Sequence, residues 1–85
     1  MGEANFNKKQ CIRALKKLGF FLDHSRRGRH DKYCPPVEMF KQLSGFAPRF
    51  IMIPRHNELH VQNEILSELK AMGGEELVRR FKEEL

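Results

Sequence analysis

Residues 7–18, NKKQCIRALKKL, have the pattern of an amphipathic helix with a marked start and end. Asn7 and Gln10 form a capping box at the start, and Gly19 is the residue type that ends helices. The apolar positions recur at helical spacing and form one face: Cys11, Ile12, Leu15 and Leu18. Because an apolar helix face has to be buried against another element, this helix requires a second layer of structure.

Three further stretches predict strands for that layer. FFLDHS at 20–25 starts with aromatic residues and has no helical period. RFIMIP at 49–54 is almost entirely apolar, which predicts a central or well-covered strand that ends at Pro54. RHDKYC at 29–34 follows a turn at Gly28 and alternates in polarity. The alternation places two sets of side chains on opposite faces: Arg29, Asp31 and Tyr33 on one, and His30, Lys32 and Cys34 on the other.

The rest of the chain predicts helices. Residues 58–72 have a helical apolar stripe that ends at Gly73 and Gly74, and residues 75–85 form a short third helix. Residues 35–48 are long for a hairpin loop and suggest a short helical turn that ends near Gly45. The order α-β-β-β-α-α predicts an α+β, two-layer fold with a three-stranded antiparallel sheet and helices on one face. The other face of the sheet, or its edge, is then free for a ligand.

The length of 85 residues indicates a single domain spanning 1–85. No apolar run approaches the ~20 residues that cross a bilayer, and the polar N-terminal residues do not resemble a signal peptide. We therefore expect a cytoplasmic protein with no membrane partner. Its two cysteines, Cys11 and Cys34, are far apart and are expected to be reduced and to act as small, buried apolar side chains.

Positive charge is concentrated in the first part of the chain. Residues 1–34 contain nine Lys or Arg and three acidic residues, a balance of +6, whereas residues 35–85 contain seven and eight, a balance of −1. A segregated excess of this kind indicates a polyanionic partner, most simply nucleic acid.

The densest basic stretch is RRGRHDKY at 26–33, which contains His30. A histidine can accept and donate a proton near neutral pH, and neighbouring cations would bind a phosphodiester and stabilise charge that develops on phosphorus. RNA carries its own nucleophile, the 2′-hydroxyl, so its cleavage requires no metal. Residue type alone favours a histidine that only contacts phosphate or solvent. The phosphate-binding candidates are Arg26, Arg27, Gly28, Arg29, Lys32, Lys8 and Lys9, of which Arg26, Arg27 and Lys32 suit a site beside His30 best.

A metal site is the weaker interpretation of the histidines. His56 and His60 are four residues apart and could bind one metal from a helix, with His30 and Cys34 as further ligands. Their spacing matches no established zinc pattern, and nucleotide-binding and hydrolase motifs are absent from the sequence. We therefore expect neither a metal nor another cofactor.

The order of the elements and three stretches resemble the HicA-type toxins, small messenger-RNA-cleaving ribonucleases of toxin–antitoxin pairs. KQCIRALKKLGF resembles the first helix of the family, and GRHDKY resembles its Gly-Ser-His strand motif. IMIPRHNELHVQNEILSELKAMGG resembles its strand-to-helix segment. Together the stretches cover most of residues 8–74, and their order and spacing are more specific than any one of them.

This resemblance implies a fold like that of double-stranded-RNA-binding domains and a metal-independent mRNA interferase whose catalytic histidine is His30. Gly28 occupies the position of the motif glycine, and Arg29 stands where the family usually has serine. Pro54 and His56 match a proline–x–histidine of the family that we interpret as structural or RNA-contacting. The resemblance also implies neutralisation by a HicB-type antitoxin, and an acidic partner covering residues 26–33 would suit the charge.

Two other functions remain open at this point. A non-catalytic RNA-binding module would use the same fold to contact shape and phosphates without a histidine. A protein-interaction domain would instead present its basic face to an acidic partner. For a ribonuclease, the second proton-transfer group is also open between Tyr33, His24 and His56. The sequence does not determine the RNA sequence preference or the oligomeric state.

Overall fold

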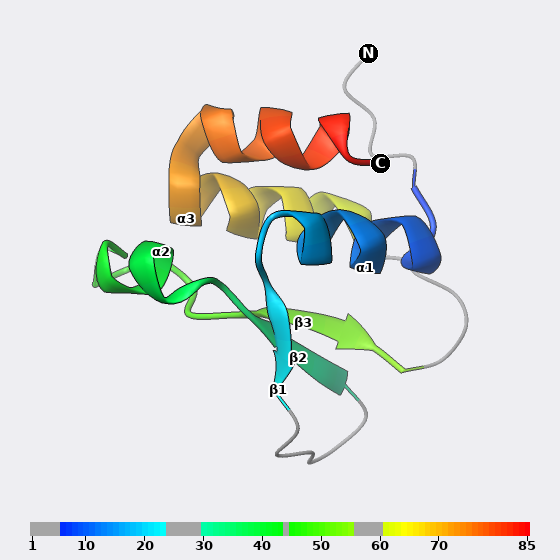
Figure 1. The fold of residues 1–85 in the computed structure, drawn as a ribbon, viewed down its shortest axis with the longest axis horizontal. Helices are drawn as coiled ribbons and strands as arrows, with labels where there is room; N and C mark the ends of the chain where they lie inside the picture. The colour runs from blue at the N-terminus through cyan, green and yellow to red at the C-terminus, as the bar shows by residue number, and fades with distance from the viewer. Residues whose placement is uncertain (1–5, 24–29, 44, 56–60) are drawn as a thin grey trace.

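The computed structural model describes residues 6–23, 30–43, 45–55 and 61–85 (Figure 1). Its elements are, in chain order, α1 (Lys8–Lys17), β1 (Phe21–Asp23), β2 (His30–Cys34), α2 (Val37–Lys41), β3 (Ile51–Pro54) and α3 (Gln62–Glu83). The protein is therefore α+β, with a three-stranded antiparallel sheet and helices, as the sequence predicts.

Helix α1 begins and ends where its capping residues predict. The Asn7 side chain accepts a hydrogen bond from the Gln10 backbone N–H at 2.8 Å, and the Gln10 side chain accepts one from the Asn7 N–H at 2.9 Å. This reciprocal pair is the predicted capping box. Gly19, directly after the C-cap residue Leu18, adopts a φ of 95° that few other residues tolerate.

The sheet has the order β1-β2-β3, so β2 is central and β3 lies at an edge. Of the two predicted alternatives, a central or a well-covered third strand, the first is therefore wrong. The strand is nevertheless largely covered: Ile51 and Ile53 face the core and are fully buried. On the opposite face Pro54 is buried as well, whereas Met52 remains 37% exposed.

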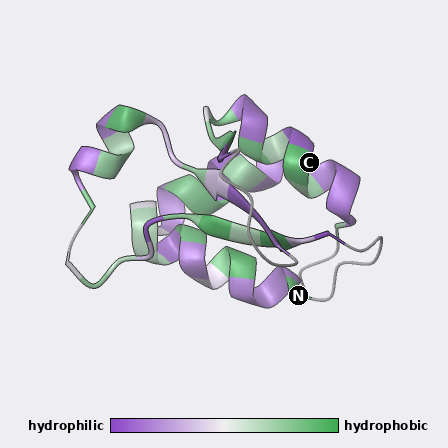
Figure 2. Ribbon diagram, turned by 90° about the horizontal axis from the view of Figure 1, so that it is seen from below, coloured by the Kyte–Doolittle hydropathy of each residue, from purple (hydrophilic) through white to green (hydrophobic). Residues whose placement is uncertain are grey.

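Helices α1 and α3 pack on the same face of the sheet, as Figure 1 shows, and Figure 2 shows the molecule from below with each described residue coloured by hydropathy. The core between these layers contains Leu15 from α1, Ile65 and Leu69 from α3, and Tyr33 and Ile53 from the sheet. We call the opposite side the outer face. It carries Phe21, which is 50% exposed, and Met52.

Helix α3 consists of two helical segments joined at a bend. Gly74 has a φ of 74° and a ψ of −167°, which interrupts the helix at the predicted Gly-Gly break. In Figure 1 the second segment, orange to red, turns back over the first, in yellow. The predicted helix start at residue 58 lies outside the described residues, and Val61 is the N-cap of the observed helix.

The predicted helical turn within residues 35–48 is α2, a five-residue helix. Side chains of this segment and of the loop that follows are unusually exposed for apolar residues: Val37 at 63%, Phe40 at 43% and Phe46 at 102%. Within the described residues, none of the helices combines the length and apolar character that crossing a membrane requires.

Candidate functional site

Three elements meet at the end of the sheet where β2 begins. His30, the first residue of β2, pairs with Pro54, the last residue of β3. Arg55 follows directly, and its backbone carbonyl accepts a hydrogen bond from Lys8 Nζ of α1 at 2.8 Å. The basic start of α1 and the predicted catalytic strand are thus brought to the same end of the molecule, although 22 positions separate Lys8 from His30.

His30 is solvent-exposed at this end. The strand alternation places its side chain on the outer face together with Lys32 and Cys34, as predicted, because Tyr33 between them is buried on the helix side. An exposed imidazole on an open sheet face can reach a large substrate such as a polynucleotide. The face that the sequence predicts for His30 is therefore the accessible one.

Lys32 lies two residues further along the same face. Its Nζ is 3.8 Å from Asp23 Oδ2, across the β1–β2 pairing, and 4.5 Å from the centre of the Phe50 ring. Both contacts are partly exposed and weak enough for a phosphate to replace the carboxylate. Lys32 is thus a partly exposed cation on the same face as His30.

Four of the predicted phosphate-binding residues, Arg26, Arg27, Gly28 and Arg29, lie outside the described residues, as do His24, His56 and His60. Of the other two candidates, Lys9 is exposed near the start of α1. Lys8 is half-buried and contacts Arg55.

Tyr33 does not share the face of His30. It is 4% exposed, packs in the core on the helix side, and its pKa is raised above the usual value by burial and by the nearby charge of Asp31. A buried phenol on the opposite face of the sheet cannot exchange a proton with a substrate bound at His30. Of the three candidates for a second proton-transfer group, the structure thus removes Tyr33.

Arg55 is the residue that the sequence reasoning missed. Its Nε donates to Asp31 Oδ1 at 3.0 Å, and its Nη2 is buried without a hydrogen-bond acceptor among the described residues. Asp31 pairs with the buried Ile53, so this ion pair lies on the helix side of the strand and not on the face of His30. The signal available in the sequence was its position directly after a strand-ending proline, but the pairing with Asp31 depends on the sheet register.

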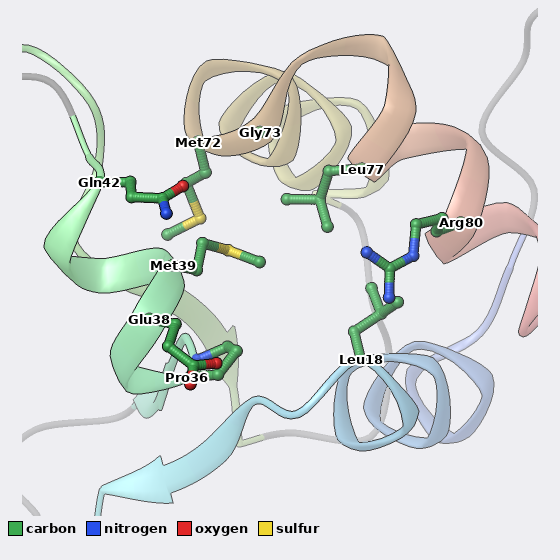
Figure 3. Close-up of a pocket in the computed structure, with 9 residues that line it drawn as sticks. All are labelled: Leu18, Pro36, Glu38, Met39, Gln42, Met72, Gly73, Leu77 and Arg80. Carbon is green, nitrogen blue, oxygen red and sulfur yellow. The ribbon is translucent and has the colours of Figure 1, made fainter.

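A pocket of about 380 Å³ lies elsewhere, between α2, the end of α1 and the bend of α3 (Figure 3). Its walls combine apolar side chains with polar and charged ones, among them Leu18, Met39, Met72, Glu38, Gln42 and Arg80. Neither a histidine nor a cysteine is among the described residues that line it. It is separate from the His30 end in composition and in the elements that form it.

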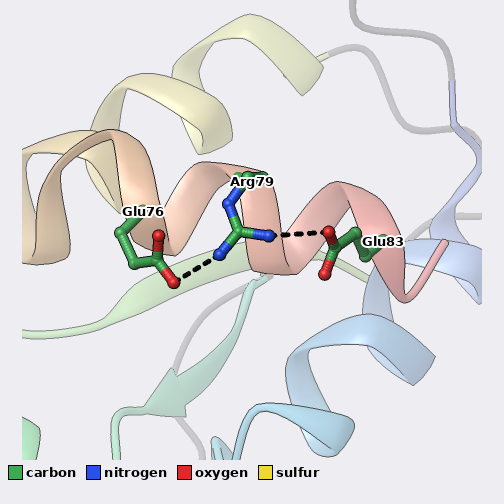
Figure 4. Close-up of polar contacts among 3 residues, drawn as sticks. All are labelled: Glu76, Arg79 and Glu83. Atoms are coloured by element: carbon green, nitrogen blue, oxygen red, sulfur yellow. Dashed lines mark hydrogen bonds and ion pairs between the residues drawn. The ribbon is translucent and has the colours of Figure 1, made fainter.

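Acidic residues neutralise cations on the second segment of α3. Arg79 donates to Glu76 at 2.5 Å and to Glu83 at 2.7 Å, as Figure 4 shows. The hydrogen bond and charge of Arg79 lower the pKa of Glu76, so this pair stays ionised at neutral pH. The positive charge of Arg79 is therefore neutralised by two carboxylates, in agreement with the nearly balanced charge of residues 35–85.

Within the described part of the chain, no three His, Cys, Asp or Glu side chains are grouped so that they could hold a metal ion. His56 and His60, on which the metal interpretation depended, are outside that part.

Comparison of the chain with protein-family models, with curated proteins and with solved structures found no match.

Proposed function

We propose that the chain is an RNA-binding endoribonuclease that cleaves messenger RNA in the manner of the HicA-type toxins, with His30 as its acid–base residue. The observation that carries the proposal is the position of His30. It is exposed at the start of β2, on the same face as Lys32, and at the end of the molecule where Lys8 and Arg55 meet. Residues 24–29, with their three arginines, lead directly into it.

The chemistry requires few protein groups. His30 withdraws the proton of a 2′-hydroxyl, the hydroxyl oxygen attacks the adjacent phosphorus, and the bond from phosphorus to the 5′-oxygen breaks. Lys32, Arg26 and Arg27 bind the phosphate and stabilise the negative charge that develops on it. His24 and His56 remain the candidates for protonating the leaving oxygen.

The fold and the partner belong to the same proposal. The order is α-β-β-α-β-α, in which the short α2 stands before the third strand. Helices α1 and α3 on one face of a three-stranded antiparallel sheet support a fold like that of double-stranded-RNA-binding domains. The excess of positive charge in residues 1–34 supports an acidic, HicB-like antitoxin as the neutralising partner.

The test is RNA cleavage in EDTA by the His30→Ala variant. We expect the cleavage rate to fall by about 10²–10⁴-fold, the range that a general acid–base residue contributes. RNA affinity should be retained, because the cations remain. His30 is exposed, so the substitution should leave the thermal midpoint unchanged.

Lys82→Ala provides the matched control, because Lys82 is an exposed cation on the second segment of α3. It should cleave RNA like the unmodified protein. Cleavage by His30→Ala at the unmodified rate would show that another residue carries the chemistry.

One observation favours the alternative, a non-catalytic RNA-binding module. No second proton-transfer group stands beside His30 among the described residues, since Tyr33 is buried on the opposite face. The alternative predicts RNA binding that weakens steeply with salt and no cleavage by the unmodified protein.

A further inference from the structure

The strand register arranges the outer face of the sheet in rows. Phe21 pairs with Cys34 in one row, Asp23 with Lys32 and then Met52 in the next, and His30 with Pro54 in the last. Phe50 also belongs to this face, because Lys32 Nζ lies 4.5 Å over its ring. Two aromatic rings therefore flank Cys34, and His30 occupies the far end of the same strand.

These rings combine exposure with neighbouring cations. Phe21 is 50% exposed and Phe50 is partly exposed, while Lys32 lies against Phe50. Next to this face, the Arg49 guanidinium lies 5.5 Å from the centre of the half-exposed Phe40 ring. The cores of protein–protein interfaces are depleted of lysine, whereas surfaces that bind single-stranded nucleic acids combine cations for phosphates with rings for bases.

The spacing suits one strand of RNA. Cys34, between the two rings, is four residues from His30, which corresponds to about 13 Å along a β-strand. A short unpaired segment of RNA can span this distance, so one strand can contact the rings and the imidazole at the same time. A duplex keeps its base faces stacked inside and cannot offer them to Phe21 and Phe50.

We propose that the outer face of the sheet is a stacking platform for single-stranded RNA, with bases on Phe21 and Phe50 and phosphates on Lys32, leading to His30. The inference rests on the proposed RNA-binding function and adds its substrate class: an unpaired segment. Specificity for unpaired RNA then comes from the sheet, while the cations contribute affinity for any nucleic acid.

The chain contains no tryptophan, so Phe21→Trp introduces a single fluorophore on the platform. The probe is a single-stranded decamer that is 2′-O-methylated throughout, which prevents cleavage and separates binding from catalysis. We expect the decamer to quench the emission of Phe21→Trp, because a base stacks on the indole, and a duplex of the same sequence to leave it unchanged. Phe46→Trp, on a fully exposed ring away from the strands, should show no quenching by either probe.

Phe21→Ala measures how much the ring contributes to the affinity for the decamer. We expect its affinity for the decamer to fall by about five- to a hundredfold, as for the loss of one stacked base. Phe46→Ala should bind like the unmodified protein, and circular dichroism should show that both variants are folded.

The outcomes separate this inference from the proposed function. Histidine-dependent cleavage by the unmodified protein, with no quenching of Phe21→Trp by saturating decamer, overturns the platform and leaves the ribonuclease standing. Quenching without any cleavage supports the platform and removes the catalytic proposal. If the protein binds no RNA, both the stacking platform and the proposed ribonuclease are overturned. Emission from Phe21→Trp that changes with protein concentration alone means that a second copy covers this face, and this also overturns the platform.

Discussion

At the scale of single residues, burial assigns different roles to side chains of the same type. Cys11, on α1, is fully buried in the core, and its pKa is raised to about 12 by this burial. Cys34 lies on the outer face and is only partly buried, and its pKa is raised by burial and by the charge of Asp23. The sequence predicts two buried cysteines, and only Cys11 fulfils that prediction because β2 alternates between a covered and an open face.

The buried thiol predicts a loss of stability at alkaline pH. A folded-state pKa above the unfolded value means that the neutral thiol favours folding below about pH 9, and that this contribution is lost as pH rises towards 12. Between pH 9 and 11 the free energy of unfolding should decrease by about 2–3 kcal/mol more in the unmodified protein than in Cys11→Ala. Urea unfolding at several pH values measures this difference. Cys34→Ala is the control and should keep the alkaline loss, whereas equal pH profiles for all three proteins would contradict the assignment.

At the scale of elements, the glycine pair in α3 decides the shape of the helical layer. Gly74 has the positive φ that turns the chain, and a Cβ on Gly73 would lie 2.8 Å from Leu77 Cβ. The bend therefore requires Gly74 for its backbone conformation and Gly73 for close packing. The sequence predicted a break here from residue type alone. It did not predict that the second segment turns back to place Leu77 and Phe81 in the core.

Replacement of Gly74 by alanine should destabilise the fold by about 1–3 kcal/mol, because an L-residue is strained at this φ. The measurement is the midpoint of thermal or urea unfolding. Gly45→Ala is the matched control, since a Cβ at Gly45 meets no atom within 4 Å and its φ is not positive. A loss of stability in the control equal to that of Gly74→Ala would mean that the bend is not the cause.

In the strands too, the sequence predicts features within one strand but not the position of that strand in the sheet. The ends of β2 and the faces of its side chains follow from alternation within the strand, and the prediction for His30 and Lys32 is confirmed in the structure. The edge position of β3 was not predictable, because an apolar run is equally consistent with burial on two faces and with an open face that carries Met52. Only the pairing of β3 with its neighbouring strand decides which of these two arrangements is present.

At the scale of the whole molecule, one aromatic contact joins the segment before α1 to the second segment of α3. The rings of Phe6 and Phe81 meet edge to face with centroids 5.3 Å apart, and Phe81 is fully buried. This contact lies on the helix side of the sheet. The core is therefore closed by residues from opposite parts of the chain, while Phe21 and Met52 on the outer face remain exposed.

Phe81→Ala should lower the free energy of unfolding by about 3–5 kcal/mol, the range for truncating a buried aromatic residue. Phe46→Ala makes the same chemical change on a fully exposed ring and should alter stability by less than about 0.5 kcal/mol. Chemical denaturation of both variants measures the contrast. A small effect at Phe81 would show that the second segment of α3 contributes little to the core.

The sequence by itself determined the helix cap at Asn7, the break at Gly74, the strand alternation around His30 and the segregation of positive charge. These features depend on residues within a few positions of each other or on composition, so no tertiary contact is needed to predict them. The tertiary structure alone decided that Lys8 and Arg55 lie at the His30 end and that Phe21 and Phe50 share its open face. Those placements depend on the register between strands that are distant in sequence, where a shift of one residue would exchange the two faces of the sheet.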